Sequence, residues 1–595
     1  MASESEGQDG QYRPRRSPTQ VRQNVTIKVD IAADAPPFGA GSSLRGSEKS
    51  PSRFAAAVAI ALGGASILAA LPVRAATETP GSVVTVQSGR VRGSAGDGVE
   101  AFKGIPFAAP PVGKLRWRAP QPAASWPGTR DATHFAPNCM QIAPAWIAAG
   151  PDTRYAEDCL YLNVWKPAGK PQKRPVLVWI HGGAFINGGS SYPVYDGSAF
   201  AKRGIVFVSL NYRLGRLGFF AHPALTAAKE GPLGNYGYAD QIAALEWVKR
   251  NIAAFGGDPA RVTLMGESAG GISVADLLVS PAASGLFEQA IVMSGGGRAA
   301  MSNRPLGERT AEGLSAEDVG LAFARSAGVE GDGPDVLGRL RALPAAKVIE
   351  GLTGANLKIN GEPKDGLTHV GGPIIDGWIK QGVVDAMMRR GAGPHVPVMV
   401  GTTSGDLGVP TGQSKSELFA AFGAGAKAAA AAYDPGGQRP EADVRDDVTR
   451  DRLLTEPARF MAKETVRQGS PAWFYRFSYV PAAYRGTWKG VPHGADTSFF
   501  FGNVDAQLGE SATDEDRAAG VQATAYVANF VLGGNPNGTG LPAWREFSSD
   551  PSGVLDIGSP AETAMGADPL GARLDLVEAS AGAPLVQAEP ATGSH

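Results

Sequence analysis

The stretch that most restricts the fold is residues 261–271, which read RVTLMGESAGG. Residues 262–265 form a short apolar run typical of a buried strand, and residues 272–279 are typical of the start of a helix. Only Gly-Glu-Ser-Ala-Gly separates them, so the sequence predicts a strand, a tight turn and a helix with Ser268 at the apex. Glycines suit so sharp a turn because side chains there would collide with the strand or the helix.

The G-x-S-x-G pattern has two interpretations. As a bare pattern it can be a plain glycine-rich turn. The flanking strand and helix favour the alternative, in which the turn holds the serine hydroxyl out of the fold. The helix N-terminus then points free N–H groups at whatever binds the serine, which stabilises developing negative charge. Ser268 is therefore the candidate nucleophile.

A second glycine-containing turn follows another predicted strand. Residues 176–180 (VLVWI) are continuously apolar, as in a strand covered on both faces, and HGGAF follows directly. Alone, this could be a plain turn, but a glycine pair leaves backbone N–H groups unobstructed, as an oxyanion hole requires. We expect that hole to consist of the N–H groups of Gly182, Gly183 and Ala269, with His181 orienting the loop.

A serine nucleophile requires a base, and few histidines are available. In the hydrolase fold that presents a serine on such a turn, the order along the chain is serine, acid, histidine. The predicted strand 396–400 leads into a glycine-rich loop whose one carboxylate is Asp406. Beyond it only His493 and His595 remain, and His595 is the last residue of the predicted flexible tail. The order predicts Asp406 as acid and His493 as base, although each alone could be an ordinary loop residue.

Apolar strands alternate with amphipathic helices through the middle of the chain. Residues 205–210 are strand-like, and residues 235–255 carry apolar side chains at helical spacing. This alternation predicts an α/β fold with a large, mostly parallel central sheet and helices on both faces.

The two ends differ in composition from the middle. Residues 1–53 are polar with few aromatics, which predicts a disordered leader. Residues 54–71 are almost wholly apolar, follow basic residues and lead to a V-x-A site, so residues 54–76 are predicted to be a signal peptide for export to the periplasm or medium. A membrane anchor is the alternative, but the run is short of about 20 residues and contains a glycine pair. Residues 558–595 are rich in Ala, Gly and Pro, which predicts a flexible tail.

The cysteine count and the charge restrict the partners. Cys139 and Cys159 are the only cysteines, and in an exported protein their simplest use is one disulfide; two separate thiols are the alternative. The net charge of -1 gives no case for nucleic acid or an anionic membrane, and no Cys/His spacing suggests a metal. A small neutral molecule is the expected partner, with no stable membrane anchor after signal cleavage.

Eight ordered blocks resemble the type-B carboxylesterase family, the relatives of cholinesterases and bacterial para-nitrobenzyl esterases. They are FKGIPFA, PPVGKLR, EDCLYLNV, HGGAF, NYRLG, FGGDP, GESAGG and HGAD. The resemblance implies one α/β-hydrolase domain, over residues 77–557, that cleaves carboxylic esters through an acyl-enzyme without metal or cofactor. It also implies a Cys139–Cys159 bridge, an ion pair of Arg116 with Glu157, and Ser294 beside the acid.

One departure concerns the acid. The family usually carries Glu there, whereas this chain reads Ser-Gly-Asp-Leu-Gly around Asp406. The side chain is one methylene shorter, so either its loop lies closer to His493 or a different carboxylate serves. Two other functions fit the same scaffold: a non-catalytic binding or adhesion module, and amide hydrolysis or acyl transfer.

Overall fold

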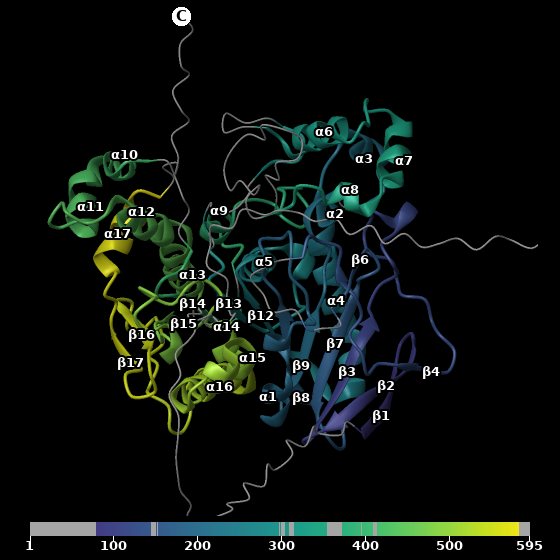
Figure 1. The fold of residues 1–595 in the computed structure, drawn as a ribbon, viewed down its shortest axis with the longest axis horizontal. Coiled ribbons are helices and arrows are strands. Elements are labelled where there is room, and N and C mark those ends of the chain that lie inside the picture. The colour runs from purple at the N-terminus through teal and green to yellow at the C-terminus, as the bar shows by residue number, and fades with distance from the viewer. Residues whose placement is uncertain are drawn as a thin grey trace, which may run out of the picture. The chain divides into compact units, whose positions relative to one another are not determined.

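One 13-stranded sheet organises the chain (Figure 1). The structure, a computed structural model, describes residues 79–143, 150, 153–231, 233–296, 298, 304–308, 314–353, 372–393, 395–407 and 413–581. The predicted leader (1–53) and signal peptide (54–76) lie outside these residues. Along the main path the strands are β1 (Thr79–Val86), β2 (Gly89–Gly96), β3 (Val99–Pro106), β7 (Tyr161–Pro167), β9 (Val206–Leu210), β8 (Arg174–Ile180), β12 (Gly257–Glu267), β13 (Gln289–Met293), β14 (Val398–Thr403), β15 (Ala472–Phe477), β16 (Gly553–Ile557) and β17 (Ala564–Ala567), with β4 (Thr129–Asp131) paired to β2.

The centre of the sheet is parallel and its edges are antiparallel. Each neighbouring pair from β9 through β8, β12, β13, β14 and β15 to β16 is parallel. Strands β1, β2, β3, β7 and β9 pair antiparallel in turn, as do β16 and β17. The predicted α/β class with a mostly parallel sheet is confirmed.

Helices cover both faces of this sheet, as predicted. One face carries α4 (Tyr236–Asn251), α5 (Ala269–Leu278) and α13 (Glu456–Arg467), and the other carries α1 (Ser198–Lys202), α14 (Thr497–Phe501) and α16 (Asp514–Gly533). The other α-helices are α2 (Gly215–Gly218), α3 (Pro223–Ala228), α6 (Ala316–Ser326), α7 (Pro334–Ala342), α8 (Ala345–Val348), α9 (Val384–Arg389), α10 (Lys415–Ala420), α11 (Ala426–Tyr433), α12 (Glu441–Arg450), α15 (Val504–Leu508) and α17 (Gly571–Ala579).

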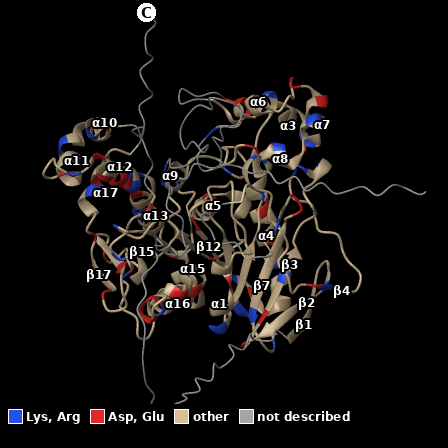
Figure 2. Ribbon diagram, in the orientation of Figure 1, with Lys and Arg blue, Asp and Glu red and all other residues tan. Residues whose placement is uncertain are grey.

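The prediction of a flexible tail from residue 558 is wrong for residues 558–581, because they contain β17 and α17. Leu574 and Val577 of α17 are buried, and Arg573 binds the buried Asp451 at 2.6 Å, beside the acidic α12 (Figure 2). The Ala- and Gly-rich composition of the whole segment gave no sign of the helix, which depends on the apolar i, i+3 pair Leu574 and Val577 and on the ion pair of Arg573. Residues 582–595 lie outside the described part.

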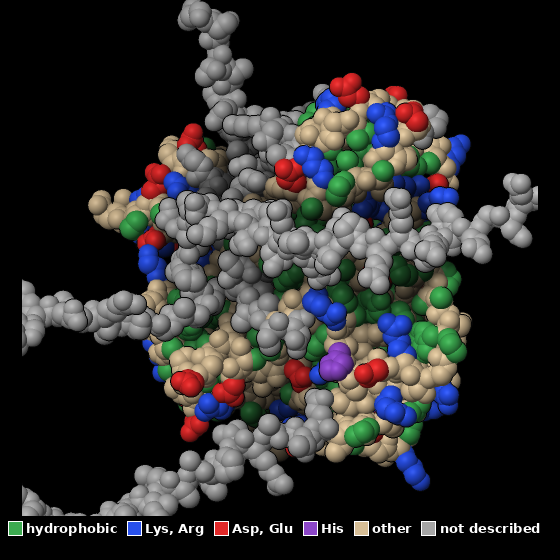
Figure 3. Space-filling model, turned by 45° about the vertical axis from the view of Figure 1, so that its right-hand side comes forward, with side chains coloured by type: hydrophobic (Ala, Val, Ile, Leu, Met, Phe, Trp, Pro, Cys, Tyr) green, Lys and Arg blue, Asp and Glu red, His purple; other side chains and the backbone are tan. Residues whose placement is uncertain are grey.

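Charges of both signs are interspersed over the described residues on the face in Figure 3. Ion pairs join charges of opposite sign in the described part of the chain, such as Arg485 with Glu515 at 2.9 Å. Within the described ranges, no helix is both long and apolar enough to cross a membrane.

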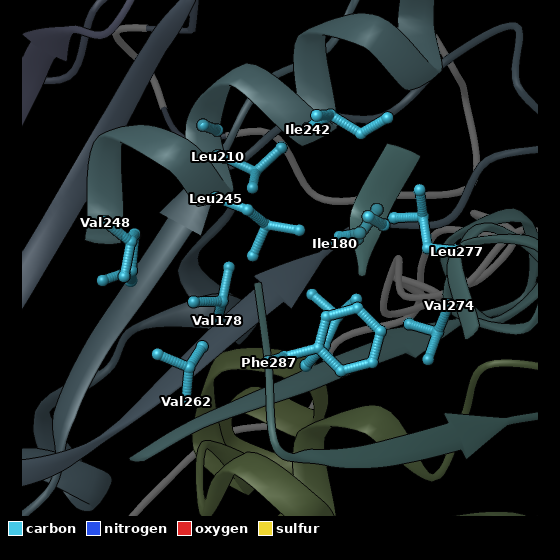
Figure 4. Packing of buried hydrophobic residues seen from close by; sticks show 14 of the residues in the cluster. Val178, Ile180, Leu210, Ile242, Leu245, Val248, Val262, Val274, Leu277 and Phe287 are labelled. Carbon is cyan, nitrogen blue, oxygen red and sulfur yellow. The ribbon is translucent and has the colours of Figure 1, made fainter. Parts of the chain in front are cut away.

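Strand β8 shows how the sheet is buried on both sides. Val176, Val178 and Ile180 pack with α4 and α5, as Figure 4 shows for two of them. The alternate residues Leu177 and Trp179 pack against α14 and α16 on the opposite face. Successive side chains of a strand point to opposite faces, so a continuous apolar run is required here. This double burial fixes the sheet whose edge carries the candidate site.

Two expected local contacts are present near the N-terminal part of the sheet. Cys139 and Cys159 form a disulfide with a Cα–Cα distance of 4.9 Å, joining β5 (Asn138–Cys139), which pairs with β6 (Tyr155–Ala156), to the start of β7. Arg116 holds Glu157 through two hydrogen bonds of 2.6 and 2.8 Å. Both predictions are confirmed.

Removal of the disulfide should lower stability. Replacing Cys139 and Cys159 with serine opens a loop of sequence separation 20, which increases the entropy of the unfolded chain. We expect the free energy of unfolding to fall by about 3 kcal/mol. Thermal unfolding checks this: the variant should melt below the wild type, and a reductant should lower the midpoint of the wild type alone. Equal midpoints without reductant would contradict the prediction.

Candidate active site

Ser268 lies at the junction between β12 and α5, where the predicted turn is found. Its backbone has a positive φ, with φ 56° and ψ −124°, a conformation that costs a non-glycine residue about 1–3 kcal/mol. Two hydrogen bonds hold it: Ser268 N donates to Met293 O at 3.0 Å, and Ser268 O accepts from Ile272 N at 2.8 Å. The serine is thereby held at the end of a central strand.

The glycines around Ser268 are required by close backbone approach. A Cβ on Gly266 would lie 2.3 Å from the carbonyl oxygen of Gly270. A Cβ on Gly270 would lie 2.1 Å from the carbonyl oxygen of Ile180 in β8. Any side chain at either position would therefore force the strand, the turn and the helix apart.

Neighbouring parallel strands deliver the other candidate residues to the same edge. Ser294 directly follows β13, Asp406 lies three residues beyond β14, and the loop after β15 leads to His493. Because the carboxyl ends of parallel strands share one edge, residues far apart in sequence meet there.

The structure brings together Ser268, His493 and Asp406. The Nε2 atom of His493 lies 2.7 Å from Ser268 Oγ, and its Nδ1 atom lies 2.5 Å from Asp406 Oδ1. Both pairs of atoms are close enough to form hydrogen bonds. The predicted hydroxyl, imidazole and carboxylate therefore form one continuous chain.

The carboxylate of Asp406 is fully buried and held on all sides. Its Oδ2 accepts from Ser294 Oγ at 2.6 Å and from Thr403 N at 3.1 Å, and its Oδ1 accepts from Leu407 N at 2.8 Å. Burial raises the pKa of Asp406, but the charge of His493 and these hydrogen bonds outweigh it and lower the pKa below its usual range. The expectation that Ser294 lies beside the acid is confirmed.

Sequence analysis missed two carboxyl groups near the imidazole. Glu267, directly before Ser268, is buried with Oε1 3.4 Å from His493 Nε2. Burial raises its pKa to about 7. Asp496 is also fully buried, and burial together with the carboxylates Glu267 and Asp406 raises its pKa well above the usual range. Their adjacency to Ser268 and His493 in the chain was the available signal.

These carboxylates set the charge preference of the imidazole. Burial lowers the pKa of His493. The charges of Glu267 and of Asp406 raise it by more than burial lowers it, so the net pKa lies above its usual range. The site therefore stabilises the imidazolium that forms when His493 accepts a proton.

The loop after β8 lies against Ser268. A Cβ on Gly182 would be 2.6 Å from Glu267 Oε2 and 3.0 Å from Ser268 Cβ, so backbone approaches the serine where a side chain could not. Gly183 has φ 110°. Ala269 follows Ser268 as the first residue of α5. Two of the three residues expected to form an oxyanion hole, Gly182 and Ala269, therefore lie beside the serine, and Gly183 follows Gly182 in the same loop.

His181 supports this loop instead of taking part in the hydrogen-bond chain. Its ring is buried, stacks on Tyr212 at 4.5 Å between centroids and bonds the carbonyl oxygen of Gly182 at 2.8 Å. Burial lowers its pKa to about 4, so the ring is neutral near pH 7. Within the described ranges, no group of three or more His, Cys, Asp or Glu side chains could hold a metal ion.

Comparison with known proteins adds to this geometry. The sequence profile of the Carboxylesterase family matches residues 80–418 and 427–572. A fumonisin B1 esterase from Sphingopyxis macrogoltabida is 35% identical over 534 residues, covering 84% of this chain and 93% of that protein. A para-nitrobenzyl esterase from Bacillus subtilis (strain 168) is 34% identical over 478 residues, covering 78% and 93%.

The fold is also similar to solved structures. A PNB esterase structure superposes with a TM-score of 0.68 at 31% identity, covering 83% of this chain and 99% of that chain. The expected α/β-hydrolase fold is thus confirmed. Because the family profile covers most of the chain, this protein belongs to the carboxylesterase family and is a carboxylic ester hydrolase.

Proposed function

We propose that the protein cleaves small carboxylic esters through an acyl-enzyme formed on Ser268. The observation that carries this proposal is the chain of hydrogen bonds from Ser268 Oγ through His493 to Asp406, at 2.7 and 2.5 Å. A nucleophile bonded to a base, with the base oriented by a third group, is the arrangement that acyl transfer requires.

The first half of the reaction forms the acyl-enzyme. Ser268 Oγ attacks the ester carbonyl carbon while His493 Nε2 accepts its proton, which gives a tetrahedral oxyanion. His493 then donates that proton to the leaving alkoxide oxygen as the C–O bond breaks, and the alcohol departs. Asp406 holds the imidazole with Nδ1 protonated and stabilises its charged form.

The second half repeats these steps with water. His493 takes a proton from a water that attacks the acyl carbon, then returns it to Ser268 as the acid is released. In both halves the oxyanion is bound by the N–H groups of Gly182, Gly183 and Ala269. One such donor contributes roughly 3 kcal/mol to transition-state stabilisation.

The alternatives depend on the same residues. A binding or adhesion module has no need of a serine hydrogen-bonded to a histidine, so the geometry favours catalysis. Amide hydrolysis and acyl transfer would use the same groups. Comparing the turnover of ester and amide substrates that share one acyl group would rank these activities.

We also propose that the mature protein is exported. The disulfide between Cys139 and Cys159 supports this proposal, because disulfides persist in oxidising compartments.

Ser268→Ala should abolish turnover of a chromogenic ester, because the attacking oxygen is lost. The matched test is labelling with an organophosphonate, followed by mass spectrometry of the intact protein and of its peptides. We expect one adduct on Ser268 in the wild type and none in the variant. Retained turnover in Ser268→Ala, or labelling elsewhere, would overturn the assignment.

Asp406→Asn should leave the fold intact and lower kcat by about 10⁴-fold, because the amide favours the wrong imidazole tautomer. Thermal unfolding serves as the control for the fold, and steady-state kinetics measure the loss. Activity near that of the wild type would move the acid to another carboxylate.

Glu267→Gln should shift the pH dependence of kcat/KM. The neutral side chain no longer stabilises the imidazolium, so the pKa of His493 falls and the base is free at lower pH. We expect the ascending limb of the profile to move to lower pH than in the wild type. A limb that stays in place, or moves upward, would show that Glu267 is not charged beside the imidazole.

A further inference from the structure

The loops that carry the acid and the base are joined directly to one another. Gly405 N donates to Val491 O at 2.9 Å, and Val491 N donates to Ser404 Oγ at 2.9 Å. Gly405 and Pro492 form an isolated parallel β-bridge. The connection therefore lies one residue before Asp406 and two residues before His493.

Two glycines face each other across this connection. A Cβ on Gly490 would lie 2.9 Å from Gly405 N and 3.0 Å from Gly405 Cα. Conversely, a Cβ on Gly405 would lie 2.8 Å from Gly490 C and 3.0 Å from its carbonyl oxygen. The atoms met are backbone, which cannot swing away as a flexible side chain can.

Backbone conformation does not explain these glycines. Neither Gly405 nor Gly490 has a φ in the left-handed region, whereas nearby Gly494 does, at 74°. An alanine could adopt their φ without strain. What the two positions need is the absence of a side chain between the loops.

Because the side chain of Asp406 is short, its contact with His493 depends on the distance between the two loops. Its carboxylate accepts hydrogen bonds from Thr403 N at the end of β14 and from Leu407 N next to it in the chain, so it cannot extend far from its backbone. The 2.5 Å contact with His493 Nδ1 therefore depends on how closely the two backbones approach.

We propose that Gly405 and Gly490 are positioning residues: their backbone contact sets the separation at which an aspartate, and not a longer acid, meets the catalytic imidazole. This inference rests on the proposed function of Asp406 and His493. It predicts that a side chain inserted between the loops and a longer acid compensate for one another.

A double-mutant cycle of Gly490→Ala and Asp406→Glu tests the compensation. The added methyl separates the loops, so we expect kcat/KM of an ester to fall by about 10²-fold with little change in KM. Asp406→Glu alone should also lose activity because the longer acid overfills the site. The kcat/KM of the double variant should be about tenfold higher than that of Gly490→Ala. Residues in contact commonly show a coupling of this size.

The pH profile separates positioning from general damage. The charge of Asp406 raises the pKa of His493, so loosening their contact in Gly490→Ala should move the ascending limb to lower pH, and Asp406→Glu should move it back. Gly436→Ala is the matched control, because its Cβ meets nothing within 4 Å. We expect that variant to keep wild-type kinetics and the wild-type profile.

A third variant covers the case in which Gly490→Ala does not fold. Ser404→Ala adds no bulk and removes the acceptor of Val491 N, so we expect a smaller loss of kcat/KM, about tenfold, with the same direction of pH shift. Unchanged kinetics in a folded Gly490→Ala, losses that simply multiply in the cycle, or unchanged Ser404→Ala would overturn the inference.

The controls distinguish this inference from the proposed function. If Ser268→Ala keeps its activity, the proposed function fails and takes the inference with it. If Ser268→Ala is inactive while the loop variants behave as the wild type, the function stands and only the positioning role is refuted.

Discussion

The close approach of backbone around Ser268 is the constraint on which the site depends. Gly266 and Gly270 let β12, α5 and the end of β8 approach within distances that no Cβ would tolerate. At this point the serine has a positive φ of 56°, at a cost of about 1–3 kcal/mol. The same approach brings Gly182 against Ser268, so the candidate nucleophile and one of its expected oxyanion donors are held by the same backbone contacts. Neither could be moved without disturbing the other.

Charge at the site is divided in a way that suits acyl transfer. Glu267 and Asp406 both lie beside the imidazole, where positive charge would develop in the proposed reaction. Backbone N–H groups at the start of α5 lie on the side of the serine, where negative charge would develop. Because these groups are buried or belong to the backbone, their positions are set before substrate arrives. The protein therefore does not have to reorganise its dipoles during the reaction.

Much of this arrangement could be predicted because short sequence patterns indicate the turns and strands that build it. The turn at Ser268, the HGGAF loop and the apolar strands have short-range signals, and the order of residues left only Asp406 and His493 to complete the chain of hydrogen bonds. The rest depends on contacts between distant segments. Glu267 stands directly before Ser268 in the sequence, but its place beside His493 depends on a 3.4 Å contact across 226 residues of chain. Helix α17 was missed because tertiary ion pairs and two buried side chains stabilise it, against its composition.

The aspartate shows why a motif departure can leave a site intact. A shorter acid has fewer rotatable bonds, so less side-chain entropy is lost when it is held, but it reaches less far. The distance must then be supplied by the backbone, and here hydrogen bonds between the loops at Gly405 and Val491 supply it. The position of the carboxylate is thus fixed by paired backbone and not by the length of a flexible side chain. A substitution at the acid position is therefore best judged together with the glycines of the loop that faces it.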